Sequence, residues 1–324
     1  MAVFLDGSVF FRLPSKKMAE KLDGFYIFVT HMREYCYTVA GHGFSVHVAP
    51  GIDMEEGLAH YAPFATDPAA TPERAFRLQV VSKEELTEPE GMVEEFNQDD
   101  DGSQIRLCRT PDGRSWFDFS LFGTLSGTML ADLDFSTATL ALHAKDEFAL
   151  NNALMVMYAL RTASMGTALF HAAVIGNAGR GYLFLGKSGT GKSTHARLWL
   201  KYIPGSELVN DDNPVVRVFP DGTARVYGSP WSGKTPCYRN MDLPLGAFVQ
   251  LAQAPANAIR RLKGISAYAA LVPSISGKRW DRQMADGLHE TENALAMQVP
   301  VWHLDCLPDE AAARLCADTI TREG

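Results

Sequence analysis

The chain has 324 residues, of which 46% are hydrophobic and 21% are charged, and its formal net charge is −8. This composition excludes a disordered chain, a collagen-like fibre and a small disulfide scaffold, and the negative charge argues against a nucleic-acid-binding protein. The five cysteines are odd in number and far apart, and no CxxC pair occurs. That usage fits a reducing compartment, so we expect a cytoplasmic protein.

The sequence shows no pattern typical of targeting or membrane insertion. Its first residues lack a basic segment followed by an apolar stretch. The most apolar helical candidate, residues 147–165, is interrupted by Asn151, Asn152 and Arg161 and falls short of the roughly 20 apolar residues that span a bilayer. We expect a buried helix there and no membrane partner. Whether the protein forms a homo-oligomer stays open.

The first part of the chain is predicted to be rich in β-strands. β-Branched and aromatic residues are concentrated in three short segments, 25–29, 44–48 and 77–81. Turn signals occur at residues 41–43 and 111–113. Short apolar segments separated by turns of this kind predict a sheet of short strands.

An acidic stretch lies within this β-rich part. Between Gly51 and Asp101 there are 14 Asp or Glu residues against three basic ones, a net charge of −11, so the remainder of the chain carries +3. We interpret this stretch as a solvated loop and hairpin face. A metal site and a surface for a basic partner are the alternatives.

The pattern changes after the apolar helix to strand, loop, helix and strand. We therefore place a domain boundary near Asp146, between a β-rich N-terminal domain of residues 1–146 and a nucleotide-binding domain of residues 147–324. The fold class that follows is α/β.

The most informative segment matches the phosphate-loop pattern GxxxxGK[ST] from Gly186 to Ser193. An apolar run, 182–185, precedes it and suits a buried strand, and a helix is predicted to begin at about Lys192. Glycines let the backbone curl so that N–H groups point at phosphate oxygens, beside the positive end of the helix dipole. Lys192 is expected to reach the β- and γ-phosphates, and the Ser193 hydroxyl to bind Mg²⁺. The predicted nucleotide-binding residues are Gly186, Lys187, Ser188, Gly189, Thr190, Gly191, Lys192, Ser193 and Thr194.

Two adjacent carboxylates, Asp211 and Asp212, follow a predicted strand at residues 207–210. A carboxylate at the end of a neighbouring strand is where phosphate-loop proteins hold Mg²⁺. The second acid is then free to accept a proton from an attacking hydroxyl. A simple turn is the alternative, because Asp-Asp-Asn-Pro is good turn chemistry. The sequence does not decide which acid is the base and which binds the metal.

A histidine, His171, lies on a predicted strand ahead of the phosphate loop, separated from it by a turn at residues 177–181. A lone histidine is usually structural. Its place beside the loop also suits a residue that orients a carboxylate, contacts phosphate or binds a metal.

A glycine-rich run at residues 228–235 follows a predicted hairpin at residues 215–227. Lys234 in this run is a candidate for stabilising the transferred phosphoryl group, and a surface lysine on a structural turn is the alternative. Arg239 is a weaker candidate. At the end of the chain, residues 311–316 are predicted to form a capped helix that buries Cys316, and Cys306 before it is expected to be buried as well.

The order of His171, phosphate loop and Asp211-Asp212 resembles that of the HPr kinase/phosphorylase family and, more distantly, of the ATP-dependent phosphoenolpyruvate carboxykinases. The matching segment runs from Phe170 to Val216, which is under a sixth of the chain. The resemblance implies that the second domain has the fold of HPr kinase and of the carboxykinase C-terminal domain.

Roles for individual residues follow from the same resemblance. It implies that Lys192 and Ser193 bind phosphate and Mg²⁺ and that His171 is the active-site histidine. Asp212 matches the proton acceptor of the kinases, although the matching acid of the carboxykinases is a metal ligand, and Asp211 matches the partner on the metal side. The chain departs from the kinases in having no acid at residues 228–235, where they carry a second metal ligand.

The sequence as a whole predicts an ATP- and Mg²⁺-dependent phosphotransferase, similar to HPr kinase, that moves the γ-phosphoryl group to a hydroxyl acceptor. The acceptor is a serine on a small protein, a free hydroxy-amino acid or another small alcohol. A nucleotide hydrolase and a non-catalytic nucleotide sensor are the alternatives. An acid positioned as a general base favours transfer.

Overall fold

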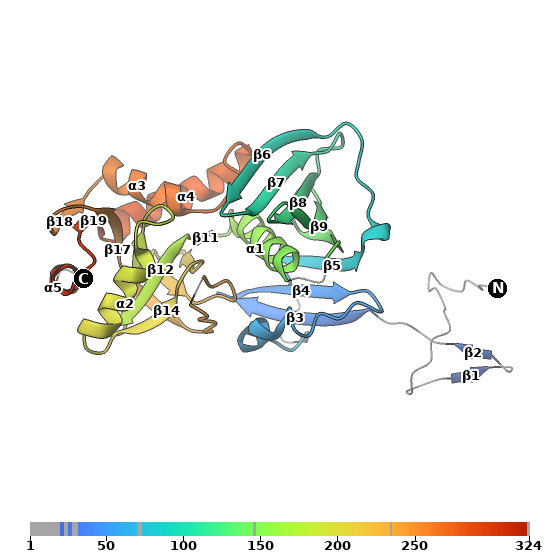
Figure 1. Ribbon diagram of the computed structural model, residues 1–324, viewed down its shortest axis with the longest axis horizontal. Helices are drawn as coiled ribbons and strands as arrows, with labels where there is room; N and C mark the ends of the chain where they lie inside the picture. The colour runs from blue at the N-terminus through green and yellow to red at the C-terminus, as the bar shows by residue number, and fades with distance from the viewer. Residues whose placement is uncertain are drawn as a thin grey trace.

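The part of the chain that the structure, a computed structural model, describes folds into two large β-sheets and five α-helices (Figure 1). The structure describes residues 32–69, 73–144, 147–233 and 235–322, together with two short paired strands, β1 (Glu20–Leu22) and β2 (Phe25–Ile27). The helices are α1 (Phe148–Thr162), α2 (Lys192–Tyr202), α3 (Ile265–Leu271), α4 (Arg282–Gln298) and α5 (Glu310–Ile320). The mixed α/β class agrees with the prediction.

The first large sheet has eight strands in the spatial order β3-β4-β5-β10-β9-β8-β7-β6. The β4–β5 and β5–β10 pairs are parallel, and the other neighbours are antiparallel. Strand β6 is therefore an edge strand, joined to β7 by a tight hairpin. The strands are β3 (Arg33–Val39), β4 (His42–Val48), β5 (Phe76–Ser82), β6 (Val93–Asp100), β7 (Ser103–Arg109), β8 (Ser115–Leu121), β9 (Thr124–Ala131) and β10 (Thr137–Leu142).

The second large sheet has nine strands. Seven follow the order β11-β15-β16-β17-β13-β12-β14, and β19 pairs with both β17 and β18. The β13–β17 and β17–β19 pairs are parallel. The strands are β11 (Thr167–Leu169), β12 (Ala172–Asn177), β13 (Arg180–Leu185), β14 (Glu207–Asn210), β15 (Val215–Val218), β16 (Ala224–Tyr227), β17 (Asp242–Gln253), β18 (Ala258–Leu262) and β19 (Val301–Cys306).

Strand β13 is buried on both faces, and its alternation shows how the second sheet is covered. Tyr182 and Phe184 point to one face, where both rings pack on Trp199 of α2. Leu183 and Leu185 point to the opposite face and join the main core. That core is continuous with the first sheet through α1, whose residues Leu150, Leu154 and Met157 are fully buried.

Helix α1 was assigned to the second domain by the sequence, yet it packs against β8 and β9 of the first sheet (Figure 1). Its apolar residues therefore belong to the core that both sheets share. The predicted boundary at Asp146 lies outside the described residues, and the division into two domains stays a prediction. No helix among the described residues is both long and apolar enough to cross a membrane.

Most elements with a strong local signal form where they were predicted. The segments 44–48 and 77–81 lie in β4 and β5, and 25–27 form β2, whereas residues 28–29 lie outside the described residues. The C-terminal helix is capped by Asp309, whose side chain accepts a hydrogen bond from the backbone N–H of Ala312 at 2.8 Å.

Two details differ from the sequence-based expectation. The turn expected at residues 41–43 falls one residue earlier, because Ala40 and Gly41, at φ 48° and 78°, form the two-residue loop between β3 and β4. His42 already belongs to the strand. All five cysteines are free, and Cys316 is buried as predicted, but Cys306 is only half-buried at the end of β19.

Two buried histidines should make the fold sensitive to acid. Burial lowers the pKa of His195 to about 4, and burial together with the charge of Arg217 lowers that of His42 to about 4. The unfolded chain binds these protons near pH 6.5, so the unfolded state gains protons first as the pH falls. We expect each histidine to remove up to about 3 kcal/mol of folding free energy between pH 6.5 and pH 4.

Urea unfolding at several pH values between 4 and 8 measures this loss. His195 accepts a hydrogen bond from the indole N–H of Trp199 at 3.2 Å, and an amide oxygen can also accept that bond. His195→Asn should therefore flatten the pH dependence below pH 6.5. If the unfolding free energy of this variant still fell with pH as steeply as in wild type, His195 would not be the source of the acid sensitivity.

Candidate functional site

The glycine-rich segment forms a tight loop between β13 and α2. Gly186, Gly189 and Gly191 have φ values of 151°, 77° and 105°, a region that only glycine enters without strain. The loop ends where α2 begins at Lys192, as predicted. A strand, a curled loop and a helix N-terminus in this order are an arrangement that can bind a phosphate group.

Lys192 lies at the base of this loop and is only 7% exposed. Its ammonium group donates hydrogen bonds to the carbonyl oxygens of Gly186 at 3.0 Å and Lys187 at 3.4 Å. Burial lowers the pKa of Lys192, whereas the charges of Asp212, Asp100 and Asp211 raise it, and the net shift is downward. A buried cation held by backbone carbonyls is placed to exchange those contacts for phosphate oxygens.

Asp211 follows β14 and is 5% exposed. Within the described residues, its Oδ2 atom is buried and has no hydrogen-bond partner. Asn210 fixes the turn here, because its side chain donates to the Ser229 hydroxyl and accepts from the backbone N–H of Asp212. A buried carboxylate oxygen without a hydrogen-bond partner costs folding free energy unless a bound ligand, such as a metal ion, contacts it.

The oxygen atoms around Asp211 fit the way in which nucleotide-binding sites hold Mg²⁺. No group of three or more His, Cys, Asp or Glu among the described residues is arranged to hold a metal. Mg²⁺ in such sites is held by one or two protein oxygens together with phosphates and water. The unpartnered oxygen of Asp211 and the hydroxyl of Ser193, which line the same cavity, match this description.

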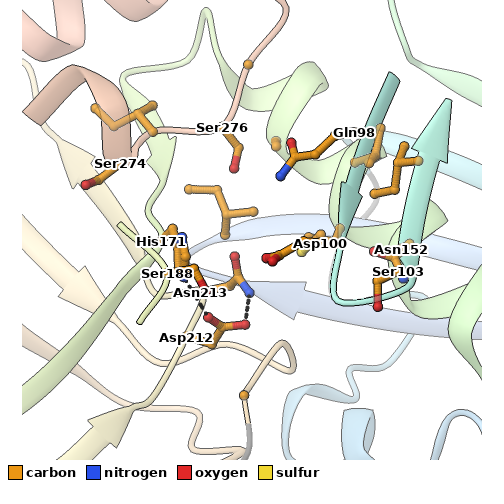
Figure 2. Close-up of a pocket in the computed structure, with 18 of the residues that line it drawn as sticks. Gln98, Asp100, Ser103, Asn152, His171, Ser188, Asp212, Asn213, Ser274 and Ser276 are labelled. Atoms are coloured by element: carbon orange, nitrogen blue, oxygen red, sulfur yellow. Dashed lines mark hydrogen bonds and ion pairs between the residues drawn. The ribbon is translucent and has the colours of Figure 1, made fainter. Parts of the chain in front are cut away.

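Asp212 faces the cavity beside two polar neighbours (Figure 2). Its Oδ1 lies 3.4 Å from Nε2 of His171, and its Oδ2 accepts a hydrogen bond from the Asn213 amide at 2.8 Å. Burial raises the pKa of Asp212, an effect that His171 and Lys192 partly offset. Burial and the charge of Lys192 lower the pKa of His171, whereas Asp212 and Asp100 raise it. A carboxylate with a raised pKa is better suited to accept a proton than an ordinary aspartate.

His171 does not lie within a strand, in contrast to the prediction. It occupies the break between β11 and β12, where its backbone N–H donates to the carbonyl of Ser274 at 2.7 Å. The next residue, Ala172, donates to the carbonyl of Asp212 at 2.8 Å. From this break the imidazole reaches the carboxylate of Asp212 (Figure 2).

A cavity of about 910 Å³ brings most of the predicted site residues together. The predicted residues that line it are His171, Ser188, Gly189, Gly191, Lys192, Ser193, Thr194, Asp211 and Asp212. Gly186, Lys187 and Thr190 complete the loop, and Thr190 packs on Gly186. Their roles in binding or catalysis stay predictions.

Lys234 lies outside the described residues, so its proposed role also stays a prediction. The neighbouring Gly233 approaches the acids closely, since a Cβ there would lie 3.2 Å from Cβ of Asp212. Arg239 points elsewhere: it forms an ion pair with Glu207 at 2.7 Å and donates to the carbonyl of Leu208. Arg239 does not line the cavity.

The sequence did not predict that the β6–β7 hairpin forms one wall of this cavity. Figure 2 shows Gln98 and Asp100 facing the side that carries His171, Asp212 and Asn213. The hairpin and the phosphate loop are about 90 residues apart in the chain, and only the pairing of distant strands brings them together. The one local signal was the acidic run that contains Asp100.

A nearly buried ion pair holds the hairpin in place. Glu95 of β6 accepts from the ammonium group of Lys278 at 2.8 Å and from the indole N–H of Trp280 at 3.1 Å. The side chains of Lys278 and Glu95 are 8% and 14% exposed. Phe96 stacks on Trp280 with ring centroids 6.0 Å apart. This part of the acidic stretch is therefore a structural contact and not the solvated face that the sequence suggested.

Breaking this ion pair should destabilise the protein. Lys278→Ala leaves a mostly buried carboxylate with one charged partner, Arg109, whose side chain is 51% exposed. We expect a loss of about 3 kcal/mol in the free energy of unfolding by urea. Arg109→Ala removes the exposed partner of the same Glu95 and should cost less than about 1 kcal/mol. Equal losses of unfolding free energy for the two variants would contradict the interpretation that the buried Glu95–Lys278 pair holds the hairpin in place.

Comparison with known proteins adds little to this geometry. No protein-family model matches the sequence, and no curated protein sequence matches it. Among solved structures, the chain is similar to the Hpr(Ser) kinase/phosphatase from Coxiella burnetii, with 14% sequence identity over 48% of this chain and 88% of that one. The TM-score is 0.29, and a likeness at this level carries no inference about function.

Proposed function

We propose that this protein is an ATP- and Mg²⁺-dependent phosphotransferase that moves the γ-phosphoryl group to a hydroxyl acceptor. The observation that carries the proposal is that one cavity holds both a phosphate-loop geometry and a carboxylate with a raised pKa, Asp212. A protein that only binds nucleotide needs no general base, whereas phosphoryl transfer to an alcohol needs a group that accepts the hydroxyl proton.

Each residue has a defined part in the proposed reaction. The loop amides and Lys192 hold the phosphates, and the Ser193 hydroxyl and Asp211 hold Mg²⁺, which when bound neutralises phosphate charge. Asp212 accepts the proton of the acceptor hydroxyl, while Asn213 and His171 fix the orientation of its carboxylate. Positioning and charge neutralisation supply most of the rate enhancement in phosphoryl transfer.

Incubation with γ-labelled ATP and a cell lysate, separated into protein and metabolite fractions, tests the proposal. We expect label on one acceptor when Mg²⁺ is present and none when it is chelated. Release of labelled phosphate without any acceptor would identify a hydrolase. ATP binding with neither transfer nor release would identify a sensor.

A further inference from the structure

The cavity extends beyond the phosphate loop into a second half formed by the first sheet and α1. Because side chains alternate along a strand, one face of β6 contributes Phe96, Gln98 and Asp100, and the same face of β7 contributes Ser103 and Ile105. Register pairs Asp100 with Ser103 and Gln98 with Ile105. The wall thus changes from polar at the hairpin tip to apolar toward its base.

Helix α1 supplies the apolar wall opposite the hairpin. Asn152, Met155 and Val156 line the cavity and are only half-buried, whereas Leu154 and Met157, which point elsewhere, are fully buried. Leu107 and Phe117 of the sheet close the same apolar end. Apolar side chains that face an open cavity are stabilised when an apolar group covers them.

The polar end carries a negative charge that the described residues do not neutralise by contact. None of them forms a hydrogen bond or ion pair with the Asp100 carboxylate, although its charge acts on Lys192 and His171. Figure 2 shows this carboxylate pointing into the cavity near Asn213. An acceptor with a cationic group near its hydroxyl complements this charge.

From these two halves we propose that the acceptor is a small amphipathic amino alcohol. Its apolar group lies between α1 and the β6–β7 wall, its ammonium group faces Asp100, and its hydroxyl faces Asp212. The ion pair between Glu95 and Lys278 joins the hairpin to the loop before α4 along one rim, which favours a small molecule over a folded protein. The inference rests on the function proposed above and names the substrate class for the same site.

The chemical step balances without a further reagent. A bond forms between the acceptor oxygen and the γ-phosphorus of ATP, and the bond from that phosphorus to the β–γ bridging oxygen breaks. ADP leaves with the bond electrons, and the hydroxyl proton passes to Asp212. The product is a phosphate monoester of the amino alcohol.

Three alcohols that differ by one feature each test the inference on the wild-type protein. L-Phenylalaninol has the apolar group, the amine and the hydroxyl; ethanolamine lacks the apolar group; N-acetyl-L-phenylalaninol lacks the charge. We expect KM for L-phenylalaninol to be about tenfold or more below that for ethanolamine. The acetylated compound should have a KM about two- to fivefold above that of L-phenylalaninol, since Asp100 is exposed.

Two variants then locate the two halves. Val156→Trp fills the apolar end and should raise KM for L-phenylalaninol about tenfold or more, with ATP affinity by calorimetry reporting whether the variant is folded. Met297→Trp places the same residue on α4 at a position that is 87% exposed and outside the cavity, and should leave this KM unchanged. Asp100→Asn should abolish the difference between the free and the acetylated amine.

The outcomes separate this inference from the proposed function. If wild-type protein binds ATP and labels a lysate protein but the three alcohols show equal KM values or no transfer, the amino-alcohol inference is wrong and the phosphotransferase proposal stands. If the protein labels no acceptor at all, both are wrong. The substrate series decides the question even if Val156→Trp does not fold.

Discussion

Replacing Asp212 with asparagine should leave ATP affinity within about twofold of wild type and slow phosphoryl transfer by a factor of about 10² to 10⁴. Asparagine has nearly the same shape as aspartate and keeps an oxygen that accepts from the Asn213 amide. It cannot take up the proton of an attacking hydroxyl. Binding and chemistry should therefore separate in this variant.

Calorimetric titration with ATP and single-turnover transfer of γ-label measure the two effects. Asp286→Asn, a substitution of the same kind at an exposed position of α4 outside the cavity, is the matched control and should leave both values unchanged. Transfer at the wild-type rate by Asp212→Asn would exclude Asp212 as the base. If neither protein transfers phosphate and both bind ATP, the sensor alternative gains support.

The pH dependence of the transfer rate is a second test of Asp212 as the general base. Because burial holds its pKa above the ordinary value of 3.8, the fraction of base in the reactive, ionised form falls earlier on acidification than for an exposed aspartate. The neighbouring His171 is kept from protonation by burial and by Lys192. The upward shift therefore favours protonation of Asp212 on acidification, whereas the downward shift keeps His171 neutral, so the rate of transfer should fall as Asp212 takes up a proton.

The sequence alone predicted where the glycine-rich loop and the helix after it form, since their signals are local. The apolar run 182–185, the glycines and the helix start at Lys192 lie within a dozen residues of one another, so their geometry depends little on the rest of the chain. Asp211 and Asp212 could be placed because β14 ends directly before them.

The cavity wall formed by the β6–β7 hairpin was not predicted, because the position of the hairpin depends on the order of strands in the first sheet. Nothing near Gln98 or Asp100 in the sequence indicates that β6 is an edge strand or that Glu95 meets Lys278 about 180 residues later. Local turn signals also failed by one residue at Ala40, where pairing of β3 with β4 decides which residues occupy the loop. Long-range pairing, and not local propensity, therefore determines the wall opposite the phosphate loop.

Replacing Lys192 with alanine should weaken ATP binding about tenfold to a hundredfold and reduce transfer at least a hundredfold further. The ammonium group is the buried cation of the loop, and its hydrogen bonds to the Gly186 and Lys187 carbonyls keep it where phosphate oxygens are expected. Alanine leaves the loop amides in place but removes this charge. Charge developing on the transferred phosphoryl group then lacks its nearest counter-charge.

Lys201→Ala is the matched control, because it removes the same charge from the last, exposed turn of α2. ATP affinity by calorimetry and labelled transfer should match wild type in this control and fall together in Lys192→Ala. Burial lowers the pKa of Lys192, which means that keeping its ammonium group charged costs folding free energy. Replacing Lys192 with alanine should therefore not lower the urea midpoint in the way that a core substitution does. Unchanged ATP affinity in Lys192→Ala, in a variant with a wild-type midpoint, would remove the phosphate-loop assignment on which the proposed reaction depends.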